Sequence, residues 1–321
     1  MFRGWKTMRH MACLVGLLIG VLLVGGAYAQ TEPKDMLVIA NNPKPRELPT
    51  LAVWQQPNKG GKMTFVKAVF PSVPGLQSDL VCYQGGDLEF IAAKPLKGGL
   101  LQLRHRCADN PQVIVVTTVT PIKGAVEFLA RLEIDPKKGG KMPEQLPGLG
   151  TCWLVCNGPG FASKPDPYPL FVKRCFIFTE KGLTFLDKTQ RSKTPSRPEK
   201  DETNNPPWVQ IYSAAWAKDM KVPANSFAGL SKDHFIYPII GVVSRDHRYL
   251  AAIVTDSASS VSQAWGDSFN NGGGWVAGPN GEKIWRCGIY ALKNDPKELL
   301  KQVAKDFPKA LTPRENRGDT Q

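Results

Sequence analysis

The chain has 321 residues, and its 41 Lys and Arg against 28 Asp and Glu give a formal net charge of +13. The basic excess is spread along the chain, so it favours solubility and weak attraction to anionic polymers or surfaces. No nucleic-acid-binding motif accompanies it, and nucleic acid is therefore excluded as an expected partner.

The first 29 residues have the three parts of a cleavable secretory signal peptide. Basic residues open the chain, an apolar run follows over 14–24, and residues 27–29 read Ala-Tyr-Ala, a small-x-small cleavage site. The apolar run is shorter than the roughly 20 residues that a transmembrane helix needs. We therefore expect an exported protein, periplasmic or extracellular, with no transmembrane segment after cleavage.

Cleavage would leave 292 residues with a net charge of +10, because the leader holds three basic and no acidic residues. That length suits one large all-β domain, and a core of this size can stand without disulfides or metals. We expect a single domain over residues 30–310 and a disordered tail over 311–321.

Six cysteines follow the leader: Cys82, Cys107, Cys152, Cys156, Cys175 and Cys287. In an oxidising compartment they could form up to three disulfides, and buried thiols packed as small apolar residues are the alternative. Cys152 and Cys156 lie on a predicted strand, where four residues span about 13 Å, too far for a mutual disulfide. No second Cys or His pair has ligand spacing, so no zinc site is expected.

Short runs rich in Val, Ile, Phe, Tyr and Thr recur between Gly, Pro, Asn and Asp clusters and predict strands. The predicted ranges are 63–70, 87–93, 100–106, 113–120, 126–134, 151–156, 175–179, 183–186, 209–212, 239–244, 249–255 and 284–292. Residues 113–116 are apolar on both faces, which is typical of the inner sheets of a thick sandwich. Tight reversals are predicted at 180–182, 245–248 and 280–282, and the proline-rich stretch 188–207 is predicted to be a long surface loop.

One helix is predicted near the C-terminus. Asp295 is a helix N-cap, Pro296 suits the first turn, and Glu298 follows three residues after the cap. Apolar residues then recur at helical spacing up to Phe307, and Pro308 ends the helix. This helix is expected to pack on the sandwich.

From Cys152 onward the pattern resembles a family of exported bacterial β-proteins of unassigned function. The similar stretches include Cys152-Trp153-Leu154, residues 161–168, residues 173–178, residues 204–208, residues 241–246 and Asp306-Phe307-Pro308. In outline these chains are similar to the galactose-mutarotase-like supersandwich, a large two-sheet fold associated with sugars. The resemblance implies an all-β fold, a supersandwich-like two-sheet β-sandwich with one C-terminal helix. It does not fix an activity.

Enzymatic motifs are absent from the sequence, which has no nucleophile elbow, zinc-protease motif or phosphate loop, and no cofactor is expected. An epimerase or polysaccharide lyase would need an acid and a base facing each other. The best candidates for these roles are His105 and Arg104, with the carboxylates of Asp87 and Glu89 on a neighbouring predicted strand. The two arginines that flank His105 also suit a solvated strand edge, which is the alternative interpretation.

A binding role requires fewer precisely placed groups than catalysis does. Aromatic side chains on loops can stack on sugar rings, while amides and acids bind hydroxyls. The stretch 265–275 has that composition and is predicted to be a loop between strands. The candidate ligand-binding residues are Trp265, Asp267, Asn270, Trp275 and Trp208. The alternative is that the tryptophans fold back onto the sandwich.

These observations favour a non-enzymatic exported module that recognises carbohydrate or a cell-envelope polymer. A sugar-active enzyme and a purely structural envelope protein are the alternatives.

The leader generates a direct prediction. The native product purified from its producing cells is expected to begin at Gln30, because signal peptidase cleaves after a small-x-small triplet. Intact-mass spectrometry with N-terminal sequencing measures this, and a product that retains Met1 would contradict the export hypothesis.

Overall fold

The fold comes from a computed structural model. It describes residues 36–58, 61–73, 76–82, 88–144, 146, 149–154, 160–161, 168–191, 209–222, 228–264 and 268–312. The predicted leader, the end of the predicted tail and residues 192–207 of the predicted loop lie outside these residues.

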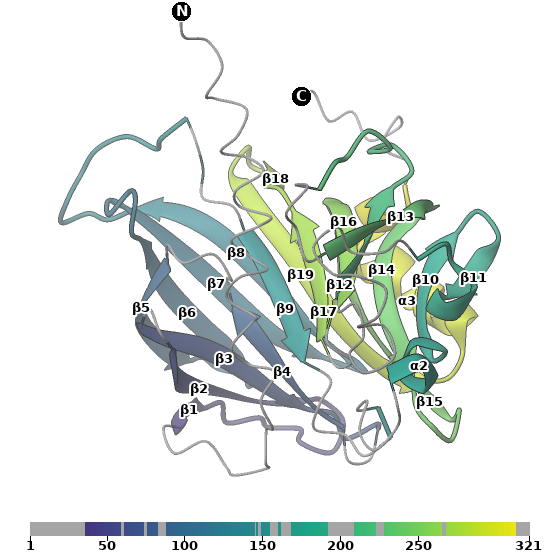
Figure 1. Cartoon of the computed structure of the whole chain (residues 1–321). Coiled ribbons are helices and arrows are strands. Elements are labelled where there is room, and N and C mark those ends of the chain that lie inside the picture. The colour runs from purple at the N-terminus through teal and green to yellow at the C-terminus, as the bar shows by residue number, and fades with distance from the viewer. Residues whose placement is uncertain are drawn as a thin grey trace, which may run out of the picture.

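Two large sheets form the protein, which is an all-β sandwich as the sequence predicts (Figure 1). Sheet A has nine strands, and sheet B has ten. In spatial order, sheet A contains β1 (Met36–Ile39), β2 (Thr50–Asn58), β3 (Gly61–Val69), β4 (Gln77–Cys82), β9 (Leu149–Leu154), β17 (Ser268–Gly273), β16 (Ala258–Ala264), β12 (Val209–Ala214) and β13 (Ala228–Phe235). Sheet B contains β11 (Gly182–Phe185), β10 (Cys175–Thr179), β14 (Tyr237–Val243), β15 (Tyr249–Thr255), β19 (Lys283–Lys293), β8 (Ala125–Ile134), β7 (Val113–Ile122), β6 (Leu101–Cys107) and β5 (Leu88–Pro95), with β18 (Val276–Ala277) paired to β19.

The two halves of the chain contribute to both sheets. Strands β1–β4 and β5–β8, purple to teal in Figure 1, make one side of the sandwich, and β10–β16 make the other side. The halves join where β9 and β17 pair in sheet A and where β8 and β19 pair in sheet B. The protein therefore cannot be divided into an N-terminal and a C-terminal sheet.

The predicted strands are confirmed wherever the structure describes them, and seven of the described strands were missed. Strands β1, β2, β4, β13, β16, β17 and the two-residue β18 were not predicted. The sequences of β16 and β17, rich in Ser, Asn and Gly, have low β-propensity, and they form strands because both lie in the middle of a sheet.

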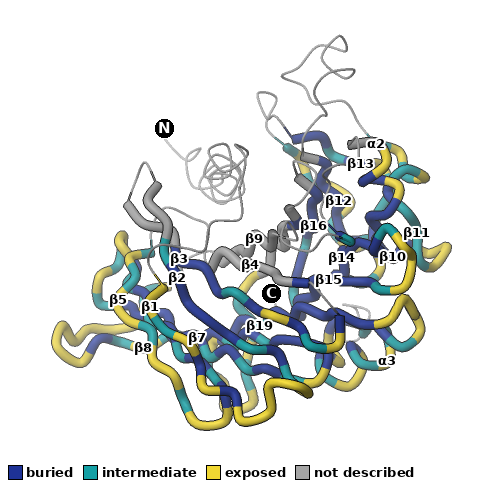
Figure 2. The backbone as a smooth tube through the Cα atoms, turned by 90° about the horizontal axis from the view of Figure 1, so that it is seen from below, coloured by how far each residue is buried: buried dark blue, intermediate teal, exposed yellow. Residues whose placement is uncertain are grey.

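Strand β19 faces a hydrophobic core on each side. Trp285 and Ile289 point between the two sheets, where the larger core lies. Tyr290 and Leu292 point to the outer face of sheet B, where a second core forms beneath a helix. This alternation follows from the two-residue period of a strand, and Figure 2 shows the buried residues concentrated along the stacked strands.

The outer face of β7 is buried for a reason that the sequence did not indicate. Ile114 and Val116 are buried there although no helix was predicted to cover them. Arg104 on β6 and Glu133 on β8 flank β7 and form an ion pair of 3.0 Å across it. The aliphatic stems of such long side chains cover apolar surface. Strand β7 is therefore apolar on both faces, although only its inner face packs against another sheet.

The C-terminal helix α3 (Pro296–Asp306) is confirmed with its predicted cap. The Asp295 carboxylate accepts hydrogen bonds from the backbone N–H groups of Lys297 and Glu298, at 2.9 and 3.2 Å. Leu299 and Val303 are buried against the outer face of sheet B. Each satisfied amide removes an unpaired helix donor, and caps of this kind are worth about 1 kcal/mol.

A second short helix, α4 (Pro308–Leu311), follows at once, so Pro308 begins a new turn after ending α3. The other helical elements are α2 (Tyr168–Val172) and the 3₁₀ turn η2 (Leu186–Lys188). None of the helices among the described residues is long and apolar enough to cross a membrane.

The three predicted reversals are confirmed as turns, and they contain left-handed residues. Gly182 has φ +87° between β10 and β11, and Gly281 has φ +79° between β18 and β19. Between β14 and β15 the left-handed residue is His247, at φ 57°. The side chain of Asn294 donates a hydrogen bond of 2.8 Å to the His247 carbonyl, which helps to hold this unusual conformation.

The described cysteines favour buried thiols. Cys107, Cys175 and Cys287 are buried. The Cys175 thiol donates to the Phe171 carbonyl at 3.3 Å, and burial raises the pKa of this thiol above its usual range. Cys156 lies outside the described residues, and so do the side chains of Cys82 and Cys152, so the pairing of these three stays open.

The contact between β19 and α3 generates a stability prediction. A methyl group added at Gly288 would lie 2.7 Å from Cε2 of the Phe307 ring. Gly288→Ala should therefore lower the free energy of unfolding by about 1–3 kcal/mol, the usual cost of overpacking a core. Denaturant unfolding followed by circular dichroism measures the change.

Gly274→Ala is the matched control. Nothing lies within 4 Å of an added methyl there, so its effect should stay within about 0.5 kcal/mol. Equal effects at the two glycines would show that the Phe307 contact does not constrain the fold.

Candidate functional site

The predicted catalytic residues are not brought together. His105 is 2% exposed and points into the core, whereas Arg104 lies on the opposite face of β6 and bonds Glu133. Glu89 is exposed and lies 3.8 Å from Arg106, also on the outer face. Asp87 lies outside the described residues. An acid–base pair between His105 and Glu89 is therefore wrong, because strand alternation puts the two side chains on opposite faces.

The interpretation of His105 as part of a solvated strand edge is also wrong. Strand β6 lies between β5 and β7, and its burial alternates residue by residue along its length. The imidazole packs edge-on against the Phe90 ring, with centroids 5.6 Å apart. Burial lowers the pKa of His105 to about 4, so the ring is neutral at pH 7.

The predicted binding loop is largely a strand. Residues 268–273 form β17 between β9 and β16, where Asn270 lies opposite Cys152 and Ser262 in the register. Trp275 follows this strand and is half-buried against the inner core, so for this residue the folded-back alternative holds. Trp208, Trp265 and Asp267 lie outside the described residues, and their roles stay predictions.

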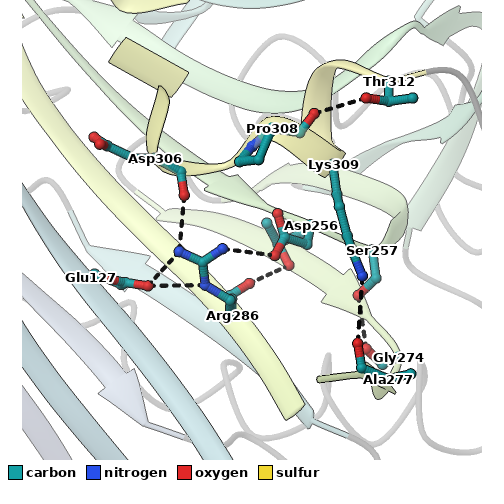
Figure 3. Close-up of polar contacts among 11 residues, drawn as sticks. Glu127, Asp256, Ser257, Gly274, Ala277, Arg286, Asp306, Pro308, Lys309 and Thr312 are labelled. Carbon is teal, nitrogen blue, oxygen red and sulfur yellow. Dashed lines mark hydrogen bonds and ion pairs between the residues drawn. The ribbon is translucent and has the colours of Figure 1, made fainter. Parts of the chain in front are cut away.

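A charged cluster on the outer face of sheet B surrounds Arg286 (Figure 3). Its Nη2 donates to Glu127 Oε1 at 2.6 Å and to the Asp306 carbonyl at 2.9 Å. Its Nη1 donates to Asp256 Oδ2 at 3.3 Å, and the guanidinium lies 4.6 Å from the centre of the Phe307 ring.

This cluster holds the C-terminal end of α3 against sheet B. Burial opposes the charge of Arg286, but the hydrogen bond to Glu127 and the charges of Asp256 and Glu127 outweigh it and raise the pKa of Arg286. Nε also donates to Glu127, at 2.9 Å, so four of the five guanidinium N–H groups are engaged by the protein itself. Few donors remain for a ligand, and the cluster's role is to hold the end of the helix.

A second polar cluster surrounds the half-buried side chain of Arg191. Arg191 donates to the Tyr212 hydroxyl at 3.3 Å and to Gln263 Oε1 at 3.2 Å. Thr189 bonds the same hydroxyl at 2.8 Å. The start of the predicted 188–207 loop is therefore fixed into the interior.

The most accessible candidate site lies where β12 and β13 end. These two strands are the one parallel pair in the described part of the chain, so their carboxyl ends meet at one edge. We call this site the β12–β13 corner and define it as Ser213, Trp216, Lys218, His234 and Ile236. Ser213 Oγ and His234 Nδ1 are 2.8 Å apart at its base.

Trp216 is the exposed part of the corner and was missed by the sequence analysis. Its backbone continues directly from Ala215, whose N–H donates to the Phe235 carbonyl at 2.9 Å, so Trp216 and Ile236 leave the strand ends together. Trp216 is 41% exposed and Ile236 is 36% exposed. The signal was present in the sequence: Trp216 follows a predicted strand, lies between alanines, and precedes a charged pair.

Ser213 cannot act as an accessible nucleophile in this conformation. A Ser–His pair resembles the first two members of a hydrolase triad, but Ser213 is 0% exposed. The hydrogen bond therefore orients the half-buried imidazole of His234. Across the described ranges, no three His, Cys, Asp or Glu side chains gather as metal ligands would.

Neither a protein-family model nor a curated protein sequence matches the chain. One solved structure that it is similar to is the Slr1438 protein from Synechocystis sp. PCC 6803, at 9% identity and a TM-score of 0.40. The match covers 83% of this chain and 99% of that one. A likeness at this TM-score supports no inference about function.

The burial of His105 generates a pH prediction. Unfolded histidine takes up a proton below pH 6.5, whereas folded His105 does so only below about pH 4. Stability should therefore fall as the pH drops from 6.5 to 4, by roughly 3 kcal/mol from this residue. His105→Phe should flatten that decline, as measured by denaturant unfolding at several pH values.

His247→Asn is the matched control, because it removes an exposed histidine at a left-handed position that Asn tolerates. Hydrogen bonds from Ser244 and then Arg248 lower the pKa of Asp246 to about 2, so its stabilising charge is lost only at more acid pH. An unchanged pH slope in His105→Phe would show that the buried ring does not govern this window.

Proposed function

We propose that the chain is an exported, non-enzymatic module that recognises carbohydrate or a cell-envelope polymer through the β12–β13 corner. Export rests on the signal peptide predicted at residues 1–29 and leads to the periplasm or the extracellular space. The galactose-mutarotase-like supersandwich remains our proposed fold class, and the two stacked sheets are compatible with it.

The exposed indole of Trp216 carries the proposal. A tryptophan at 41% exposure on a short turn offers a flat apolar face, and Ile236, at 36% exposure, follows the neighbouring strand end. Sugar rings present C–H groups on one side and hydroxyls at their rims, so they suit an apolar platform with polar neighbours. The parallel strand ends beneath the turn hold the platform in a fixed place.

The charges around the corner favour an acidic polymer. Lys218 and Lys221 are exposed on the same turn, Lys232 is exposed on β13, and Asp219 is the exposed acid among them. The mature chain would carry a net charge of +10. A positive field of this kind raises the rate at which anionic partners meet the surface.

The arrangement of the titratable groups favours binding over catalysis. Ser213 is buried, and Glu89, one of the two carboxylates proposed as a partner of His105, lies on the opposite face of the sheet. The β12–β13 corner combines the imidazole of His234, which Ser213 orients, with the exposed indole of Trp216. These are groups that a binding site needs.

Replacing the platform tests the proposal. Trp216→Ala should weaken binding by about tenfold, which corresponds to about 1.4 kcal/mol. The probes are an array of neutral and acidic glycans and co-sedimentation with purified peptidoglycan. Trp216→Phe should retain more affinity than Trp216→Ala, because it keeps an aromatic face.

Leu170→Ala serves as the control, since Leu170 is 47% exposed on α2, an element that contributes no residue to the corner. It should bind as the unmodified chain does. If the unmodified chain binds no glycan on the array and no peptidoglycan, the proposal is contradicted and a structural envelope protein is favoured. Turnover of a glycan would favour the sugar-active enzyme instead.

A further inference from the structure

The Ser213–His234 pair at the base of the β12–β13 corner depends on an irregularity in β13. From Ile211 to Ser213, β12 advances by two residues, while its partner β13 advances by four, from Leu230 to His234. Strand β13 therefore has a bulge directly before His234. Bulges re-aim side chains and are common beside functional sites.

The backbone of Gln190 holds this bulge in place. Its carbonyl accepts a hydrogen bond from the Ser231 hydroxyl at 2.9 Å, and its N–H donates to Asp233 Oδ2 at 2.5 Å. The Ser231 hydroxyl also accepts from the Asp233 N–H at 3.0 Å. The extra residues are therefore bonded at both ends, and the bulge brings His234 opposite Ser213.

The buried hydroxyl of Ser213 determines which nitrogen of His234 carries the proton. Ser213 is 0% exposed, and His234 Nδ1, at 2.8 Å, is the hydrogen-bond partner of its hydroxyl among the described residues. If Nδ1–H donated to Ser213 Oγ, the hydroxyl hydrogen would be buried without an acceptor, which is costly. When the hydroxyl donates to Nδ1 instead, both groups are satisfied. The ring is then neutral, with its proton on Nε2.

The second nitrogen of this ring is available to a ligand. Nε2 lies on the far side of the imidazole from Ser213, because Cε1 separates the two ring nitrogens. It has no hydrogen-bond partner among the described residues, and it is not enclosed by the protein. The Cα atoms of Ser213 and Trp216 are three residues apart and so at most about 11 Å from each other. The indole and the imidazole therefore belong to positions that one oligosaccharide can span.

The charged groups around His234 favour a carboxylate as the acceptor on the ligand. Lys232 is exposed two residues before His234, and Lys218 is exposed on the turn after β12. The Asp233 carboxylate is already bonded within the bulge, and Asp219 is the exposed acid on the turn. A hydrogen bond from an N–H group to a carboxylate is stronger than one to a neutral oxygen. An acidic sugar would therefore gain more at this position than a neutral one.

We infer that His234 is the specificity-determining residue of the β12–β13 corner, and that its Nε2–H group donates to a carboxylate oxygen of an acidic saccharide. Ser213 is a positioning residue, because it acts by fixing the proton on Nε2. Trp216 supplies affinity for the sugar ring, whereas His234 distinguishes a sugar acid from its neutral counterpart. The inference rests on the proposed function, since it names the ligand class and the discriminating group of the same site.

Long-range proton–nitrogen correlation NMR on the chain with isotope-labelled histidine tests the position of the proton without any ligand. The signals of His234 are identified by their absence in His234→Gln. At about pH 8, where an ordinary histidine is neutral, they should show a ring protonated on Nε2. Ser213→Ala should add signals of the Nδ1–H form. A ring protonated on Nδ1 in the unmodified chain would overturn the inference.

Binding measurements test the discrimination between acidic and neutral sugars. The probes are the acidic glycans of the array, hexuronate oligosaccharides included, each paired with its carboxyl-reduced form, and the unmodified chain should prefer the acid. His234→Phe should reduce this preference about tenfold, through the loss of one hydrogen bond to a charged group. His234→Gln keeps an N–H donor and should reduce it less. Trp216→Ala should weaken binding of both forms alike, and His247→Asn, at an exposed histidine on another turn, should change neither.

The outcomes separate this inference from the proposed function. Binding of neutral glycans only, or an unchanged preference in folded His234→Phe, would overturn the inference and leave carbohydrate recognition in place. Binding of no glycan would overturn both. If His234→Phe does not fold, His234→Gln and the NMR spectrum of the unmodified chain still test the inference.

Discussion

The fold depends on the alternation of side chains along β19. This strand lies near the middle of sheet B, and its successive residues face the inter-sheet core and the helix-covered outer core in turn. Trp285 and Ile289 pack toward sheet A, whereas Tyr290 packs toward α3, and Gly288 leaves room for the Phe307 ring. A strand with this double role fixes the separation of the sheets and the position of the helix together, because a shift of one residue would exchange the two faces.

Charged side chains also stabilise the fold, because they cover apolar surface on the outer face of sheet B. On the outer face of sheet B, Arg104 and Glu133 pair across β7, and Arg286 joins Glu127, Asp256 and the end of α3. Exposed ion pairs contribute little energy on their own, but these pairs cover apolar strand surface and use up donors that would otherwise need water. Much of the charge on this face therefore serves the architecture and is not available to a ligand.

The residues with catalytic chemistry lie in the interior, whereas the exposed aromatic residue lies at the surface. His105 and Ser213 have the chemistry of catalytic residues, yet both are buried, and burial keeps the His105 ring neutral. Trp216 has no such chemistry, yet it is the exposed aromatic residue at an edge where two parallel strands end. Accessibility, rather than residue type, is what makes the β12–β13 corner the better candidate for recognition.

The sequence by itself determined the elements whose signals are local. Runs of β-branched and aromatic residues predicted most of the strands, and Asp295 with Pro296 predicted the start of α3, because propensity and capping act within a few residues. Local patterns could not predict β16 and β17, whose Ser, Asn and Gly become strands only through neighbours on both sides. They also could not tell which face of a strand is covered.

The candidate site was decided almost entirely by the tertiary structure. Arg104, His105 and Glu89 share suitable chemistry, but only the pairing of β5 with β6 determines that the imidazole and the carboxylate lie on opposite faces. Trp216 and Ile236 are twenty positions apart and come together because β12 and β13 are parallel, an arrangement that no local pattern encodes. Strand pairing between distant segments sets exposure, and exposure sets which side chains can meet a partner.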